Sequence, residues 1–288
     1  MEPLPERLSV GVPLVRRLID TQFPRWADQP IRPVPRGGWD NHTFRLGTDM
    51  LVRLPSAASY ALAVEKEQRW LPFLAPRLPL PIPVPLAAGR PDVDYPHPWS
   101  VYRWIDGETV SVPLDSCADA LADFLTALRG VDPAGGPGPG LHNWYRGGPL
   151  QTYDEGIKDG IEKLDDPGLR GAVADSWQES LDAPWHGEPV WFHGDIAPGN
   201  LLADRGALSA VIDFGTCGVG DPACDLAIAW TSLTASAREA FRNRMGVDDA
   251  TWLRGRGWAL WKATVAGPAL DVIDRILGRA DRWPASSC

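Results

Sequence analysis

The most constraining feature of this sequence is the stretch WFHGDIAPGNLLADRGALSAVIDFG, residues 191–215. It carries three polar side chains at short intervals: Asp195, Asn200 five residues later, and Asp213. Apolar residues between them form two short runs joined by the polar turn 204–207, which predicts a β-hairpin. A hairpin of this length brings Asn200 and Asp213 close together and leaves Asp195 on the loop that leads into it.

These three side chains match the needs of phosphoryl transfer. Moving a γ-phosphoryl group requires oxygen ligands for a metal ion that neutralises the phosphates, and a carboxylate within reach of the attacking hydroxyl. Asn200 and Asp213 offer the first, and Asp195 offers the second. The plain alternative is a polar turn followed by an ordinary hairpin, but the ordered set is far more specific than any one of its tripeptides.

The set HGD, PGN and IDFG, followed by GDPACDLA, resembles the aminoglycoside phosphotransferase family of small-molecule kinases. It is also similar to the protein-kinase pattern H-R-D-x-x-x-x-N with D-F-G, except that Gly194 replaces the arginine. The resemblance implies a two-lobed α+β protein-kinase-like fold. Its small, β-rich N-terminal lobe is expected over residues 1–105 and its larger, mainly helical C-terminal lobe over residues 106–288.

The same resemblance implies roles for the motif residues. Asp195 is expected to be the catalytic base, and Asn200 and Asp213 are expected to hold Mg²⁺, with ATP or GTP as the phosphoryl donor. The implied acceptor is a hydroxyl of a small molecule, above all an aminoglycoside-type antibiotic, which would make the protein a resistance kinase. Two alternatives stay open: a kinase of another hydroxylated compound, such as a macrolide, choline or a sugar-like metabolite, and a nucleotide-binding pseudokinase without catalysis.

The end of the motif predicts a structural element. Asp221 before Pro222 is typical of a capped helix start, with proline at the first helical position, and the helix is expected to reach about Leu233. Asp221 and Asp225 are therefore expected to support the fold rather than the chemistry.

The N-terminal third predicts a short helix before Pro24 and three strands near residues 31–35, 42–46 and 50–54. Gly37 and Gly38 lie between the first two strands. Glycines at this point let backbone N–H groups approach nucleotide phosphates, although an ordinary hairpin turn explains them equally well.

A charged pair is expected beside these strands. Arg53 ends the third strand, where a kinase fold places its phosphate-contacting lysine, and its planar fork suits phosphate oxygens. A helix over residues 57–74 follows, in which Glu67 best matches the glutamate that pairs with this cation. Glu65 is the alternative partner, and a solvated helix glutamate is the plain interpretation.

Eight prolines between residues 76 and 98 exclude a helix there and favour an extended connection with an edge strand. An aromatic strand follows at residues 99–105. In a kinase fold this strand leads into the hinge, so the backbone of Tyr102, Arg103 and Trp104 is expected to hydrogen-bond the purine, with the lobe boundary near residue 106.

The rest of the chain is expected to be mainly helical, including helices over residues 114–128, 153–164 and 169–181. In the related family, insertions before the catalytic loop help to form the acceptor pocket. The acidic candidates for this pocket are Asp159, Glu162, Asp271 and Asp274. A solvated helix face is the alternative for each of them.

The composition excludes several partners. A net charge of −9 argues against nucleic acid, which demands a basic surface, and is compatible with a cationic substrate. No apolar run approaches the length of a membrane span, and the N-terminus lacks the features of a signal peptide. The four cysteines form no CxxC pair, which favours reduced thiols. We therefore expect a cytoplasmic protein without a membrane or an obligate protein partner.

Overall fold

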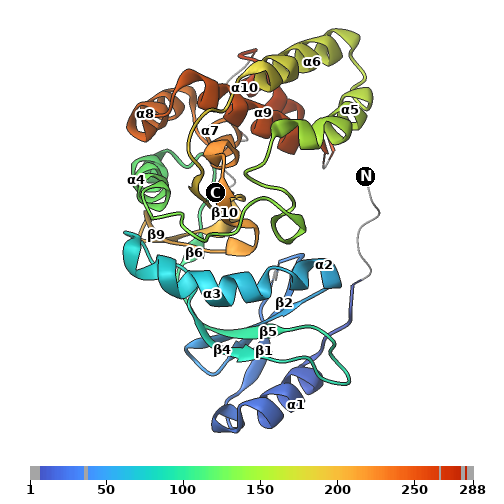
Figure 1. The fold of residues 1–288 in the computed structure, drawn as a ribbon, viewed down its shortest axis with the longest axis vertical. Helices are drawn as coiled ribbons and strands as arrows, with labels where there is room; N and C mark the ends of the chain where they lie inside the picture. The colour runs from blue at the N-terminus through green and yellow to red at the C-terminus, as the bar shows by residue number, and fades with distance from the viewer. Residues whose placement is uncertain (1–6, 36–37, 266, 280–282, 284–288) are drawn as a thin grey trace.

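The computed structural model describes residues 7–35, 38–265, 267–279 and 283, and it has the expected two-lobed, kinase-like α+β fold (Figure 1). The smaller lobe contains an antiparallel sheet in the order β1-β2-β3-β5-β4. Its strands are β1 (Ile31–Pro33), β2 (Asn41–Leu46), β3 (Met50–Pro55), β4 (Pro85–Gly89) and β5 (Trp99–Arg103). The strand in the proline-rich segment, β4, lies at the edge of the sheet as expected, where a missing proline N–H does least harm.

The helices of the small lobe lie on either side of this sheet (Figure 1). Helix α1 (Val12–Gln22) buries Val15, Leu18 and Ile19 against the sheet and forms the smaller of two hydrophobic cores with it. The single helix expected over residues 57–74 is instead two, α2 (Ala58–Ala61) and α3 (Val64–Leu74). The break lets α2 contact the large lobe at residues 141–143 while α3 packs on β4 and β5.

The large lobe contains two small sheets. The expected hairpin is present as β8 (Leu201–Asp204) and β9 (Ala207–Val211), and β6 (Glu108–Thr109) adds a third strand to it. Strand β7 (Val190–Phe192) pairs with β10 (Gly218–Gly220). Neither β6 nor β10 was expected from the sequence, because both are too short to leave a periodic signal.

Helices make up most of the large lobe. They are α4 (Ala118–Arg129), α5 (Asp154–Glu162), α6 (Pro167–Asp182), α7 (Ile228–Thr231), α8 (Ala235–Met245), α9 (Asp249–Val265) and α10 (Leu270–Ile276). Both lobes also contain short 3₁₀ segments: η1 (Pro24–Trp26), η2 (Ala75–Arg77), η3 (Asp115–Cys117), η4 (Leu141–Asn143), η5 (Leu150–Tyr153), η6 (Pro198–Asn200), η7 (Phe214–Thr216) and η8 (Pro222–Ala227). Helix α9 is central, because it packs against α5, α6, α10 and η8.

The larger core extends beyond the large lobe. Trp70, Leu71 and Leu74 of α3 belong to it, and the Trp70 ring packs edge-on against Trp191 of β7. The sheets themselves separate where the chain passes from β5 to β6, at residues 104–107. Helix α3 therefore ties the small lobe to the strand that leads into the Asp195 loop.

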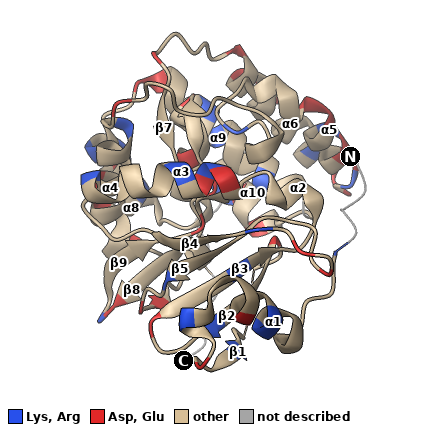
Figure 2. Cartoon of the chain, turned by 60° about the horizontal axis from the view of Figure 1, so that its bottom comes forward, with Lys and Arg blue, Asp and Glu red and all other residues tan. Residues whose placement is uncertain are grey.

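Two surface features bear on possible partners. Lys and Arg occur on the same elements as Asp and Glu, for example on α3 and α5 (Figure 2), so the excess of acidic residues is not gathered on one element. Within the described residues, no helix combines the length and the apolar character needed to cross a membrane.

Candidate active site

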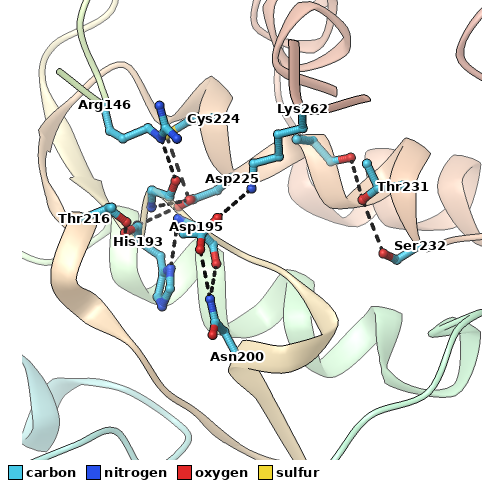
Figure 3. Close-up of polar contacts among 12 residues, drawn as sticks. Arg146, His193, Asp195, Asn200, Thr216, Cys224, Asp225, Thr231, Ser232 and Lys262 are labelled. Atoms are coloured by element: carbon cyan, nitrogen blue, oxygen red, sulfur yellow. Dashed lines mark hydrogen bonds and ion pairs between the residues drawn. The ribbon is translucent and has the colours of Figure 1, made fainter. Parts of the chain in front are cut away.

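The loop between β7 and η6 carries Asp195, and a buried carboxylate holds this loop in place (Figure 3). The side chain of Asp225 accepts hydrogen bonds from the backbone N–H groups of His193 (2.8 Å) and Gly194 (2.7 Å). Burial raises the pKa of Asp225, although His193 and these two bonds oppose that effect. Asp225 thus positions the loop.

The neighbouring Asp221 caps the segment that follows, accepting from the N–H of Ala223. Its carboxylate also forms an ion pair with buried Arg254, at 2.6 Å. The expected helix is a 3₁₀ segment for its first six residues, and the α-helix that follows ends at Thr231 rather than near Leu233. Asp221 thus anchors this part of the fold.

Gly194 has a structural reason to differ from the arginine of protein kinases. Its φ is +88°, and a Cβ built on it lies only 2.6 Å from the carbonyl oxygen of Thr216. Any side chain at this position is therefore strained by its backbone conformation and blocked by the segment after Asp213.

Asn200 and Asp213 lie side by side, as the hairpin predicted, because the N–H of Ile212 donates to the carbonyl of Asn200 at 2.9 Å. The Asn200 amide nitrogen donates to Asp195, to its carbonyl oxygen at 2.8 Å and to Oδ2 at 3.2 Å. The amide Oδ1 of Asn200 is therefore the atom left to bind an ion. Asp213 adopts a left-handed conformation, with φ of +66°, and its side chain is about one-third exposed (35%).

Arg53 reaches this site from the small lobe. Its guanidinium donates to Asp213 Oδ1 at 2.9 Å and lies 3.8 Å from Glu67 Oε1. Glu67 is buried on α3 and also accepts a hydrogen bond from the Tyr102 hydroxyl, whereas Glu65 is exposed. The structure therefore brings Arg53, Glu67 and Asp213 together across the two lobes.

The remaining nucleotide candidates are less closely grouped. Gly37 lies outside the described residues, and Gly38 is exposed, with no atom within 4 Å of a Cβ built on it. Tyr102 is buried within the sheet, between Leu51 of β3 and Pro85 of β4.

The expectation that the backbone of Tyr102, Arg103 and Trp104 binds the purine stays a prediction, but two of its N–H groups already have partners. Arg103 N–H donates to the carbonyl of Val84 at 3.1 Å, and Trp104 N–H donates to that of Asp49 at 2.8 Å. Both N–H groups are therefore used in pairing with the residues just before β3 and β4. The backbone of residues 105–107, which follows, is a further candidate for purine contacts.

The four acidic acceptor candidates lie on α5 and α10. Asp159 and Asp274 are half-buried, Glu162 is exposed, and Asp271 pairs with Arg275 of its own helix. Within the described chain, no hydrogen bond or ion pair joins any of the four to the Asp195 site. Their acceptor role stays a prediction.

Three basic residues of the site were not expected from the sequence. Lys262 of α9 donates to Asp195 Oδ1 at 2.8 Å (Figure 3). Arg146 donates to the carbonyl of Gly194 at 3.2 Å. Lys66 is buried on α3, and its ammonium donates to the carbonyls of Gly215 (2.7 Å) and Cys217 (2.9 Å), just after Asp213. These contacts join residues 48 or more positions apart, so no local sequence pattern predicts them.

The charges around Asp195 influence its ionisation. Burial raises the pKa of Asp195, but the Lys262 ammonium and its hydrogen bond outweigh that effect, so the pKa is lowered. Asp195 is therefore a carboxylate at neutral pH, as a hydrogen-bond acceptor for a hydroxyl must be.

Asp40, between β1 and β2, adds a further carboxylate. Burial and the nearby Asp213 raise its pKa to about 6, although Arg53 opposes them. Since the folded state holds a proton that the unfolded chain releases near pH 4, stability falls as the pH rises from about 4 to 6 and stays lower above. The free energy of unfolding falls by at most about 3 kcal/mol over this pH range.

We therefore expect Asp40→Asn, which cannot ionise, to be more stable than the wild type at pH 7.5, with a smaller advantage at pH 4.5. Urea unfolding of both proteins at the two pH values measures this difference. Asp165→Asn, at an exposed position, is the control and is expected to show no such change. An advantage that is equal at both pH values contradicts the charge of Asp40 as the cause.

The residues present fit a magnesium ion. Within the described residues, no three His, Cys, Asp or Glu side chains are grouped to hold a metal alone. Mg²⁺ does not need such a cage, because it binds through one or two protein oxygens plus phosphates and water. Asn200 Oδ1 and Asp213 supply those oxygens, and the mutual repulsion of Asp213 and Asp40 is what a divalent cation relieves.

Comparisons with known proteins agree with this geometry. A model described as the phosphotransferase enzyme family (APH) matches residues 31–258. No curated protein matches. Among solved structures, the GDP and kanamycin complex of APH(2")-IIia is 23% identical, covering 87% of this chain and 89% of that one, with a TM-score of 0.71. The macrolide 2'-phosphotransferase MphH from Brachybacterium faecium is 20% identical, covering 92% and 98%, with a TM-score of 0.60. At these identities the solved structures establish the fold alone.

Proposed function

We propose that this chain, which belongs to the phosphotransferase enzyme family, transfers the γ-phosphoryl group of ATP or GTP to a hydroxyl of a small molecule. The observation that carries the proposal is the meeting of Asp195, Asn200 and Asp213 with Arg53 from the other lobe. A transition state with little covalent assistance depends on such positioning and charge.

On the donor side, Arg53 grips the phosphate oxygens and Glu67 holds the guanidinium in place. Asn200 and Asp213 are the residues that would hold Mg²⁺, which when bound neutralises the charge on the phosphates. Because Arg53 already contacts Asp213, the cation from the small lobe and the proposed metal ligand act at the same point.

On the acceptor side, Asp195 receives the proton of the attacking hydroxyl. Its Oδ2 accepts from Asn200 and its Oδ1 from Lys262, so both oxygens are held in place. Each keeps a lone pair for the hydroxyl. The loop carbonyls and Asp225 fix this orientation before a substrate arrives, which is the preorganisation that catalysis needs.

The acceptor is a hydroxylated small molecule. Solved relatives are described with kanamycin, gentamicin or streptomycin bound, or as macrolide phosphotransferases, and these antibiotics are the first compounds to test as acceptors. Antibiotic resistance is the biological consequence if one of them is the substrate. The alternative of a nucleotide-binding protein without catalysis is less well supported, because Asp195, Asn200 and Asp213 are all present and grouped.

Binding of the donor tests this proposal first. We expect Arg53→Met to bind Mg²⁺-ATP and Mg²⁺-GTP about 10- to 100-fold more weakly than the wild type, because it loses charge-assisted bonds to phosphate. Titration calorimetry measures both affinities. Arg32→Met is the matched control, since Arg32 is an exposed arginine on β1 of the same sheet. A wild-type protein that binds neither nucleotide, or an Arg53→Met protein with unchanged affinity, contradicts the proposal.

A further inference from the structure

The two oxygens of Asp195 face different parts of the molecule (Figure 3). Oδ2 accepts from Asn200, at the start of the hairpin, whereas Oδ1 accepts from Lys262, on α9. Because the proposed metal ligands lie on the hairpin, the Asn200 side is the nucleotide side. The Lys262 side is therefore the side from which an acceptor approaches.

Both members of this ion pair are accessible to a small molecule. The Asp195 side chain is 43% exposed and that of Lys262 is 20% exposed. Helix α9 packs against α5 and α10, the two helices that carry the acidic candidates. An acceptor that brings its hydroxyl to Asp195 must consequently place the neighbouring atoms close to the Lys262 ammonium.

Besides Lys262, a second positive charge, that of Arg146, lies near Asp195 and lowers its pKa. Arg146 is buried, and its guanidinium lies over the rings of Tyr153, Trp258 and Trp261, at 5.3, 4.8 and 4.6 Å from their centroids. Its hydrogen bond to the carbonyl of Gly194 attaches it to the Asp195 loop. The negative charge of Asp195 is thus offset by two cations before any substrate binds.

Two exposed aromatic residues lie on a segment tied to α9, and the ring of one of them, Trp144, also packs against Tyr60 of α2, with 5.8 Å between the ring centroids. Trp144 and Tyr145 are exposed, and both have left-handed backbones, with φ of +54° and +60°, which bulky residues adopt only when the surroundings impose it. The Tyr153 hydroxyl donates to the carbonyl of Trp144, and the Tyr153 ring packs on Trp261, the residue before Lys262. The aromatic segment is therefore fixed to the same helix as Lys262.

We propose that Lys262 is a specificity-determining residue, which selects uncharged, ring-bearing hydroxyl compounds and disfavours acceptors with an ammonium group beside the reactive hydroxyl. This inference rests on the proposed function, because it takes Asp195 as the residue that meets the acceptor. Two like charges about 4 Å apart repel each other enough, even in bulk water, to weaken binding about fivefold, and more in a partly desolvated site.

Affinity for kanamycin, a polycation, tests the proposal without any need for turnover. Calorimetry compares the wild type with Lys262→Met and Lys262→Gln, in the presence of Mg²⁺-ADP. We expect both variants to bind kanamycin at least about fivefold more tightly, because the freed Asp195 carboxylate then faces a cation. Maltotriose, a neutral molecule of three rings, is expected to show no such gain, and Lys262→Arg is expected to behave like the wild type.

Lys158→Met is the matched control, because Lys158 forms a Lys–Asp ion pair of its own with Asp154 on α5 but is 67% exposed. If the Lys262–Asp195 ion pair were only structural, its removal would change the affinities for kanamycin and maltotriose by the same factor. Alternatively, it would lower the melting temperature without changing the ratio of the two affinities. The inference is overturned if kanamycin binds no more tightly to the folded Lys262 variants than to the wild type. It is also overturned if kanamycin shows no measurable binding to any of these proteins. Absence of phosphoryl transfer to any acceptor would instead count against the proposed function.

Discussion

Asp213→Ala is expected to lose phosphoryl transfer by roughly 10³-fold or more while the protein stays folded. Asp213 supplies the only carboxylate among the two proposed metal ligands, and it also receives the guanidinium of Arg53. The loose transition state depends on charge stabilisation, so the loss of this one oxygen ligand removes several kcal/mol of it. Formation of ADP or GDP in the presence of acceptor and Mg²⁺ measures the rate.

The controls for Asp213 use the same hairpin. Asp204→Ala replaces an exposed aspartate at the end of β8 and is expected to leave the rate unchanged. Asp213→Asn removes the charge but tolerates the left-handed backbone at this position, so it separates lost chemistry from backbone strain. Turnover close to the wild-type value in folded Asp213→Ala contradicts the assignment.

Asp195→Asn is expected to lower turnover by about 10²- to 10⁴-fold, the range for removal of a general base, and to leave nucleotide affinity unchanged. The separation is expected because Arg53, Glu67 and Asp213 are untouched by the substitution. Steady-state rates and calorimetric titration of the same preparation measure the two effects. A parallel loss of nucleotide affinity, or an unchanged rate, contradicts the role of Asp195 as base.

The sequence predicted those parts of the fold that depend on local signals. The hairpin follows from the turn at 204–207 and the alternation around it, and the cap at Asp221 follows from its proline. The helix expected over residues 114–128 is present as η3 and α4, and Gly130 caps its end. Because the three motif residues lie within 19 positions of one another, 195–213, the same local reasoning placed them together.

The sequence did not predict the contacts between segments that lie far apart in the chain. Lys262 lies 67 residues from Asp195, and Arg146 lies 48 residues from Gly194. A helical lysine is usually solvated. The local sequence around Lys66, KEQRWL (residues 66–71), therefore does not predict that Lys66 is buried against the segment after Asp213. The partners of the Arg103 and Trp104 N–H groups were not predicted for a related reason, because sheet pairing decides which N–H groups are used, and the sequence did not show where the neighbours of β5 begin.

Phosphoryl transfer to a hydroxyl is the central claim, and a mass-spectrometric acceptor screen tests it most directly. The wild type and Asp195→Asn are incubated with Mg²⁺ and either ATP or GTP, against aminoglycosides, macrolides, neutral glycosides and common cellular hydroxyl compounds. We predict that one class gains a single phosphate with the wild type and not with the variant. Nucleotide binding without a phosphate gain on any compound, or an equal gain with Asp195→Asn, would contradict the account.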